Sequence, residues 1–150
     1  MDRLRLTDPD ITGVPMITTT GYTFGTRMIG SLEDVRPRVE AALKAEGFGV
    51  LTVIDVQATM KARLGVDQPP FVILGACNPP LAHRALEADP SVAALLPCNV
   101  VLREDGSETI VEAMDPLAVL GIVQEPAIRS IAEEAKARLE GTIASLVAGR

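Results

Sequence analysis

Apolar and polar residues alternate along Thr18–Met28, with the two-residue period of a half-buried β-strand. Tyr22, Phe24 and Met28 fall on one side of this segment. We therefore predict a first strand here, and we expect the Tyr22 ring to pack in the core beside Phe24.

A helix is predicted after this strand, because apolar residues recur at helical spacing from Leu32 to Leu43. Ser31 precedes the stripe as a natural N-cap, and Gly47 follows it, where the absence of a Cβ suits a left-handed C-terminal cap. Pro37 disturbs the pattern, since a proline inside a helix costs roughly 3 kcal/mol. We expect the regular helix either to begin near Asp34 or to bend.

The same signals continue to the end of the chain. Strands are predicted at residues 49–56, 71–77, 98–103 and 108–114, and helices at 57–64, 80–88, near 116–121 and from 126 onward. Asp105-Gly106 between the last two strands is a strong hairpin signal. The last helix carries an apolar stripe that should pack on the sheet: Ile128, Ile131, Ala135, Leu139, Ile143 and Leu146.

This order of elements predicts an α+β fold. It is neither strict βαβ alternation nor a repeat array, so we expect a two-layer sandwich with a mixed or largely antiparallel five-stranded sheet and helices packed on one face. A chain of 150 residues forms a single domain over residues 1–150, with about residues 1–15 loosely ordered.

Composition and charge narrow the range of partners. Apolar residues make up 47% of the chain and charged residues 23%, as in ordinary globular proteins. The net charge is −6, so the electropositive surface of a nucleic-acid-binding protein is absent and we expect no nucleic-acid partner. The N-terminus does not have the pattern of a signal peptide, and no apolar run approaches the roughly 20 residues of a membrane span. We therefore expect a cytoplasmic protein with no membrane partner.

Two cysteines and a single histidine are the distinctive chemical groups of the sequence. In the cytoplasm, cysteines are expected to serve as thiols, metal ligands or a redox pair rather than a structural disulfide. Cys77 ends a predicted strand beside a helix N-terminus, where the helix dipole lowers thiol pKa values. His83 follows six residues later, and Cys98 begins the next strand. If these strands pair antiparallel, the two sulfur atoms become neighbours.

A cluster of Cys77, His83 and Cys98 suits a transition metal such as zinc, axial ligation of haem, or a reversible disulfide. A fourth metal ligand would come from Asp55, Glu112 or Asp115. Asn78, which directly follows Cys77, is a further candidate residue of the site. The alternative interpretation is structural. Both cysteines then pack as small core hydrophobes, and His83 is solvated on its helix surface.

Two carboxylates are secondary candidates. Asp55 ends an apolar strand and suits a helix N-cap, the simpler explanation of its position. Glu112 lies between apolar residues on the last strand, and burial there would raise its pKa. An acid–base role for this pair is a weaker hypothesis, because no catalytic motif accompanies it.

Three stretches resemble the small bacterial and archaeal proteins of the domain of unknown function 302 family: Lys44–Val56, Leu74–Ala82 and Leu96–Val101. The likeness runs from about Gly21 to the last helix. It implies a compact α+β domain and a homodimer, with Cys77 as one shared pattern position and Cys98 as the other, and it implies no reaction.

The sequence thus leaves two functional hypotheses and assigns no reaction, so whether the protein is an enzyme stays open. The first is a module that binds a small ligand, metal or haem-like cofactor, or performs thiol redox chemistry, around Cys77, His83 and Cys98. The alternative is a non-catalytic dimeric interaction or regulatory module with both cysteines in the core.

Overall fold

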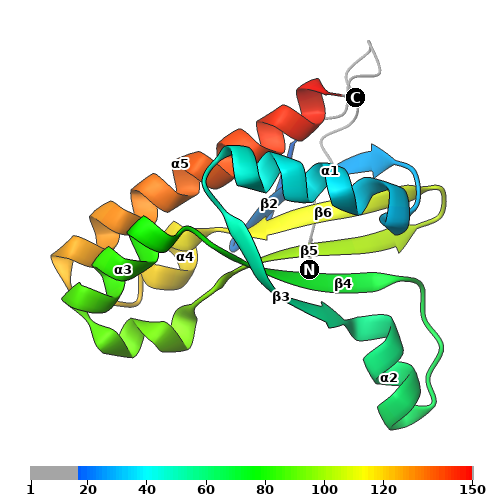
Figure 1. The fold of residues 1–150 in the computed structure, drawn as a ribbon, viewed down its shortest axis with the longest axis horizontal. Coiled ribbons are helices and arrows are strands. Elements are labelled where there is room, and N and C mark those ends of the chain that lie inside the picture. The colour runs from blue at the N-terminus through cyan, green and yellow to red at the C-terminus, as the bar shows by residue number, and fades with distance from the viewer. Residues whose placement is uncertain (1–16, 150) are drawn as a thin grey trace.

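The computed structural model describes residues 17–149 and has the expected α+β class (Figure 1). The predicted loose ordering of residues 1–15 lies outside the described residues. The strands are β1 (Thr18–Thr19), β2 (Thr23–Ile29), β3 (Gly49–Asp55), β4 (Phe71–Cys77), β5 (Cys98–Asp105) and β6 (Glu108–Met114). The helices are α1 (Leu32–Ala45), α2 (Val56–Leu64), α3 (Pro79–Ala88), the 3-10 helix η1 (Pro90–Leu95), α4 (Pro116–Leu120) and α5 (Pro126–Ala148).

The described strands form one six-stranded sheet in the order β1-β2-β6-β5-β4-β3, with every neighbouring pair antiparallel. The prediction of five strands was wrong because the segment read as one strand is two. Thr20 reverses the chain: its Oγ1 accepts hydrogen bonds from the backbone N–H groups of Tyr22 (3.1 Å) and Thr23 (2.8 Å). Tyr22 therefore lies in the turn, 58% exposed, and not in the core as predicted.

Helices α1 and α5 cover one face of the sheet and enclose the main core with it (Figure 1). Ser31 caps α1 as predicted, and its Oγ accepts a hydrogen bond from the Asp34 backbone N–H at 3.2 Å. The helix begins at Leu32 rather than near Asp34, so Pro37 lies inside it. Gly47 has the predicted positive φ, +87°.

A second apolar cluster lies beyond the end of the sheet where β4 ends and β5 begins. It is built from α3, η1, α4 and the first half of α5, and its buried residues are Leu81, Ala85, Val92, Leu120, Ile128, Ile131, Ala132 and Ala135. The second half of α5 belongs to the main core. The predicted apolar stripe of α5 is buried along its whole length, so this helix joins the two clusters.

The segment Gly49–Leu64, which we call the β3–α2 arm, is the least buried part of the described fold. Six of the seven residues of the edge strand β3 are exposed, and α2 buries none of its side chains. In Figure 1, α2 stands away from the layer formed by α1 and α5.

No helix in residues 17–149 is both long and apolar enough to cross a membrane.

Candidate ligand pocket

A pocket of about 280 Å³ lies where the second apolar cluster meets the end of the sheet. Apolar side chains dominate its wall, which also contains both cysteines and one asparagine. The lining residues are Phe48, Leu51, Ala76, Cys77, Asn78, Leu81, Ala82, Ala85, Leu86, Ala93, Leu96, Pro97, Cys98, Leu120, Ile131 and Ala135.

Small side chains explain why this space is hollow. Five of the lining residues are alanines, and three of them come from different elements: Ala76 from β4, Ala85 from α3 and Ala135 from α5. Protein interiors normally fill their space with interlocking side chains, so short ones on facing elements leave room between them.

The structure brings the two cysteines to the same wall. Strands β4 and β5 pair antiparallel as anticipated, and Ala76 is the direct partner of Cys98. Cys77 follows at the end of β4, partly exposed, while Cys98 is buried at the start of β5. The prediction that Cys77 and Cys98 are neighbours is therefore confirmed, and both residues line the pocket.

The expected lowering of the thiol pKa is wrong, because burial raises the pKa of both cysteines. Burial raises the pKa of Cys77, and burial together with the nearby Cys77 raises the pKa of Cys98 to about 11. The helix end also offers few donors. Pro79 and Pro80 have no N–H, and the Leu81 N–H is already bound to Asn78 Oδ1 at 3.3 Å. Both thiols are thus protonated at neutral pH, which disfavours nucleophilic and metal-binding chemistry.

This raised pKa makes stability depend on pH. The pKa of Cys98 is 9.0 for a free thiol and about 11 in the folded protein. The contribution of this thiol to the free energy of unfolding is therefore fully present below about pH 9 and is lost as the pH rises through 11. We expect the free energy of unfolding of the wild type to fall by about 2 kcal/mol relative to Cys98→Ala between pH 8 and pH 11. Urea denaturation across this range measures the difference.

The matched control is Cys77→Ala. This variant retains the Cys98 thiol, so its free energy of unfolding should show most of the same fall between pH 8 and pH 11. Parallel curves for the wild type and Cys98→Ala would contradict the burial of this thiol.

His83 does not join the cysteines. Its side chain on α3 is 74% exposed and lies 3.5 Å from Glu87, one helical turn away, and it is not part of the pocket wall. Within residues 17–149, no three His, Cys, Asp or Glu residues gather closely enough to hold a metal ion. The solvated position of His83 matches the alternative interpretation made from the sequence.

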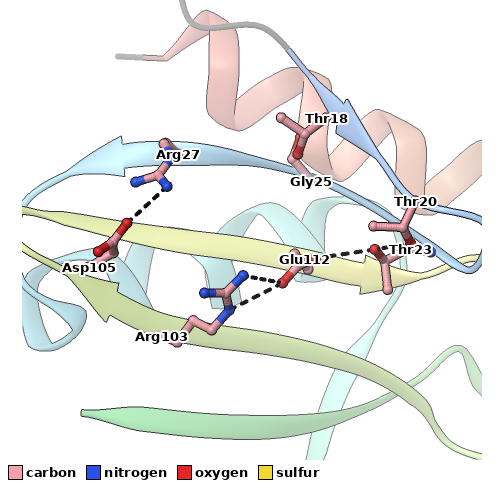
Figure 2. Close-up of polar contacts among 8 residues, drawn as sticks. All are labelled: Thr18, Thr20, Thr23, Gly25, Arg27, Arg103, Asp105 and Glu112. Atoms are coloured by element: carbon pink, nitrogen blue, oxygen red, sulfur yellow. Dashed lines mark hydrogen bonds and ion pairs between the residues drawn. The ribbon is translucent and has the colours of Figure 1, made fainter. Parts of the chain in front are cut away.

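The two candidate carboxylates have structural partners away from the pocket. Asp55 caps α2, accepting the Ala58 N–H at 2.8 Å, as the simpler explanation predicted. Glu112 lies on the sheet face opposite α1 and α5, where Oε1 accepts from Arg103 (3.2 Å) and Oε2 from Thr23 (3.2 Å) (Figure 2). Strands β6 and β3, which carry these carboxylates, are three strand spacings apart, about 14 Å. They do not act on one substrate atom.

Sequence reasoning missed the pocket itself and most of its wall. The alanines and leucines that line it carry no distinguishing pattern, because any of them also suits a closed core. Arg103, the partner of Glu112, was also missed. The strand period places Arg103 on the open face, but the cross-strand register with Glu112 exists only in the folded sheet.

Comparison with known proteins adds a family and a structural relative. The family model described as "Domain of unknown function DUF302" matches residues 24–146. A solved structure, an uncharacterised conserved DUF302 protein from Bacillus stearothermophilus, is similar at 31% sequence identity and a TM-score of 0.70. The match covers 79% of this chain and 94% of that one. No match was found among curated proteins.

Proposed function

This chain belongs to the family of domain of unknown function DUF302, and from that premise we propose that it binds a small apolar molecule in the pocket beside Cys77 and Cys98. The observation that carries the proposal is a concave, apolar pocket where the second apolar cluster meets the end of the sheet. Ligand pockets are concave and mostly apolar, with a few polar groups that fix orientation.

The size of the pocket limits its ligand. An engineered cavity of about 150 Å³ holds benzene, so a space of about 280 Å³ suits a ligand on the order of ten non-hydrogen atoms. A haem macrocycle is larger than this space, and the described wall contains no histidine that would ligate its iron. Among the ligands considered from the sequence, a small organic molecule fits best.

The chemistry of the wall supports binding rather than covalent catalysis. The wall described above contains no charged side chain, so transfer of an apolar ligand from water is the main driving force. Protonated thiols are weak donors with polarisable sulfur atoms, which gives Cys77 and Cys98 a contact role.

Toluene is a suitable first probe, because it is neutral and slightly larger than benzene. We expect a saturable titration in which NMR signals of the Leu81, Leu96 and Ile131 methyl groups shift together, while those of Ile29 and Ile122 stay in place. Shifts that are linear and spread evenly over the surface would refute the proposal.

The family resemblance implies a homodimer, and we propose in addition that the β3–α2 arm joins its two copies. An exposed edge strand presents unpaired backbone groups, and a nine-residue helix without buried side chains is marginal by itself. Leu51, Val53 and Ile54 are exposed on this strand, so a second copy would cover apolar area as well as the edge. Two identical edges pair antiparallel about a two-fold axis and form a closed dimer.

Val53→Lys tests this assembly, because a lysine on an edge strand opposes strand pairing. We expect the wild type to sediment as a dimer at micromolar concentration and the variant as a folded monomer. Ile122→Lys is the matched control, since Ile122 is also apolar, is more exposed than Val53 and lies outside the arm. A monomeric wild type, or dissociation by both variants alike, would overturn the dimer.

A further inference from the structure

The pocket beside the two cysteines opens to solvent through an apolar mouth. Three residues of its wall are exposed, and they come from three different elements: Leu51 from β3, Leu86 from α3 and Ala93 from η1. Leu51 is 67% exposed and Leu86 is 38% exposed. The buried part of the wall is also mostly apolar and includes Phe48, Ala76, Ala85, Leu120, Ile131 and Ala135. Apolar side chains therefore line the way from the buried end of the pocket to the protein surface.

A shift in strand register places Leu51 at this mouth. Val50 pairs with Ala76, and Thr52 pairs with Gly75. These two partners are consecutive on β4, so Leu51 is an extra residue without a partner on that strand. In regular pairing Leu51 would lie opposite Gly75, but Thr52 takes that place, and a Cβ at Gly75 would overlap the Thr52 hydroxyl oxygen. An extra residue of this kind re-aims a side chain, and here Leu51 lines the pocket.

The exposed leucines at the mouth provide apolar area that a ligand can cover. Contact with a hydrocarbon chain removes this area from water, which is favourable. The pocket of about 280 Å³ suits on the order of ten non-hydrogen atoms, so a longer chain has to extend past Leu51. The described wall contains no charged side chain that would replace the water around a polar head group, so such a group stays outside.

We propose that the pocket binds a single-chain amphiphile, whose hydrocarbon chain enters the alanine-lined space while its polar end stays in water beyond Leu51 and Leu86. This inference rests on the proposed binding function and specifies its ligand class. Leu51 contacts the chain where the chain leaves the protein. It therefore adds to the affinity for a molecule that spans the mouth, and little to the affinity for a molecule small enough to lie deeper.

Decyl maltoside and toluene separate these two cases. The decyl chain is long enough to fill the pocket and reach its mouth, whereas the bulky, neutral disaccharide is too large to enter. Toluene is small enough to lie wholly inside, and maltose is the head group alone. Affinities are measured by NMR titration of the methyl groups in the wall, below the micelle concentration of the detergent, and folding is measured by thermal unfolding.

Leu51→Ala shortens the side chain at the mouth. Leu64→Ala is the matched control, because Leu64 is also an exposed leucine of the β3–α2 arm, at 70%, and lies outside the pocket wall. Ala85→Leu blocks the buried end of the pocket. A second copy is proposed to pair with the same strand, so Leu51→Ala is also measured together with Val53→Lys, which separates ligand contact from assembly.

We expect decyl maltoside to bind the wild type at least about tenfold more tightly than toluene, and maltose not to bind. Leu51→Ala should weaken decyl maltoside binding about fivefold, with or without Val53→Lys, and toluene binding less than about twofold. Ala85→Leu should weaken the binding of both ligands at least about tenfold, because both use the buried end of the pocket. Leu64→Ala should change neither affinity.

Toluene binding without decyl maltoside binding would overturn the amphiphile inference and leave the pocket function intact. So would an Ala85→Leu variant that loses toluene binding and retains decyl maltoside binding. Equal losses of the two ligands in Leu51→Ala, or a loss that disappears with Val53→Lys, would overturn the inference as well. Failure of both ligands to bind the wild type would instead overturn the proposed function.

Discussion

Gly25→Ala is expected to destabilise the fold strongly, by about 3 kcal/mol or more. Gly25 lies within β2, opposite Glu112 on β6, and a Cβ there would overlap the backbone carbonyl oxygen of Val111 and approach the Glu112 Cα to 2.9 Å. Backbone cannot move aside as the end of a flexible side chain can, so β2 would have to separate from β6. We expect a loss of about 3 kcal/mol or more, a large part of the roughly 5–15 kcal/mol that stabilises a domain.

Urea denaturation followed by circular dichroism measures this loss, and Gly49→Ala provides the matched control. Gly49 is also a strand glycine, but no atom lies within 4 Å of the position that a Cβ there would occupy, and its φ is not positive. We expect Gly49→Ala to be neutral or to stabilise the protein by about 0.5–1 kcal/mol. Equal midpoints for the two variants would show that β2 and β6 do not approach each other this closely.

Ala85→Leu is expected to abolish toluene binding while the protein stays folded. Ala85 is buried on α3 and lines the pocket, so a leucine there places its side chain in the space that the ligand would use. We expect affinity to fall at least about tenfold, because filling the cavity removes the contact area of the probe. Filling apolar space also tends to stabilise a core, so the unfolding temperature should hold or rise.

Two further variants make this result specific. Ala135→Leu narrows the same pocket from α5 and should have the same effect on binding. Ala118→Leu makes the same change on α4, where Ala118 is exposed and outside the wall, and should leave binding unchanged. Undiminished toluene binding in both folded pocket variants would mean that the probe binds elsewhere.

Local patterns predicted the elements well where one interaction dominates. The Asp105-Gly106 signal correctly joined β5 and β6, with Gly106 at φ +66°, because few residues other than glycine accept that conformation. The apolar stripe of α5 was also confirmed. The missed turn at Thr20 has a different cause, since alternation continued across it and the hydroxyl contacts that reverse the chain are not visible in a periodic pattern.

The candidate site was predicted in part. Cys77 and Cys98 meet because adjacent antiparallel strands bring the end of one beside the start of the next, which element order alone suggested. His83 was expected to join them from a spacing of six residues along the chain. On a helix that begins at Pro79, the same residue is instead carried to the exposed surface.

By itself, the sequence determined the α+β class, the position of most helices and strands, the caps at Ser31 and Asp55, and the two cysteine-bearing strand ends. These features depend on the chemistry and spacing of residues close together in the chain. Only the tertiary structure decided that alanines from different elements line one pocket, and that burial raises the pKa of the Cys98 thiol to about 11. Pockets and desolvation both depend on which distant residues become neighbours, and that is settled by packing rather than by local pattern.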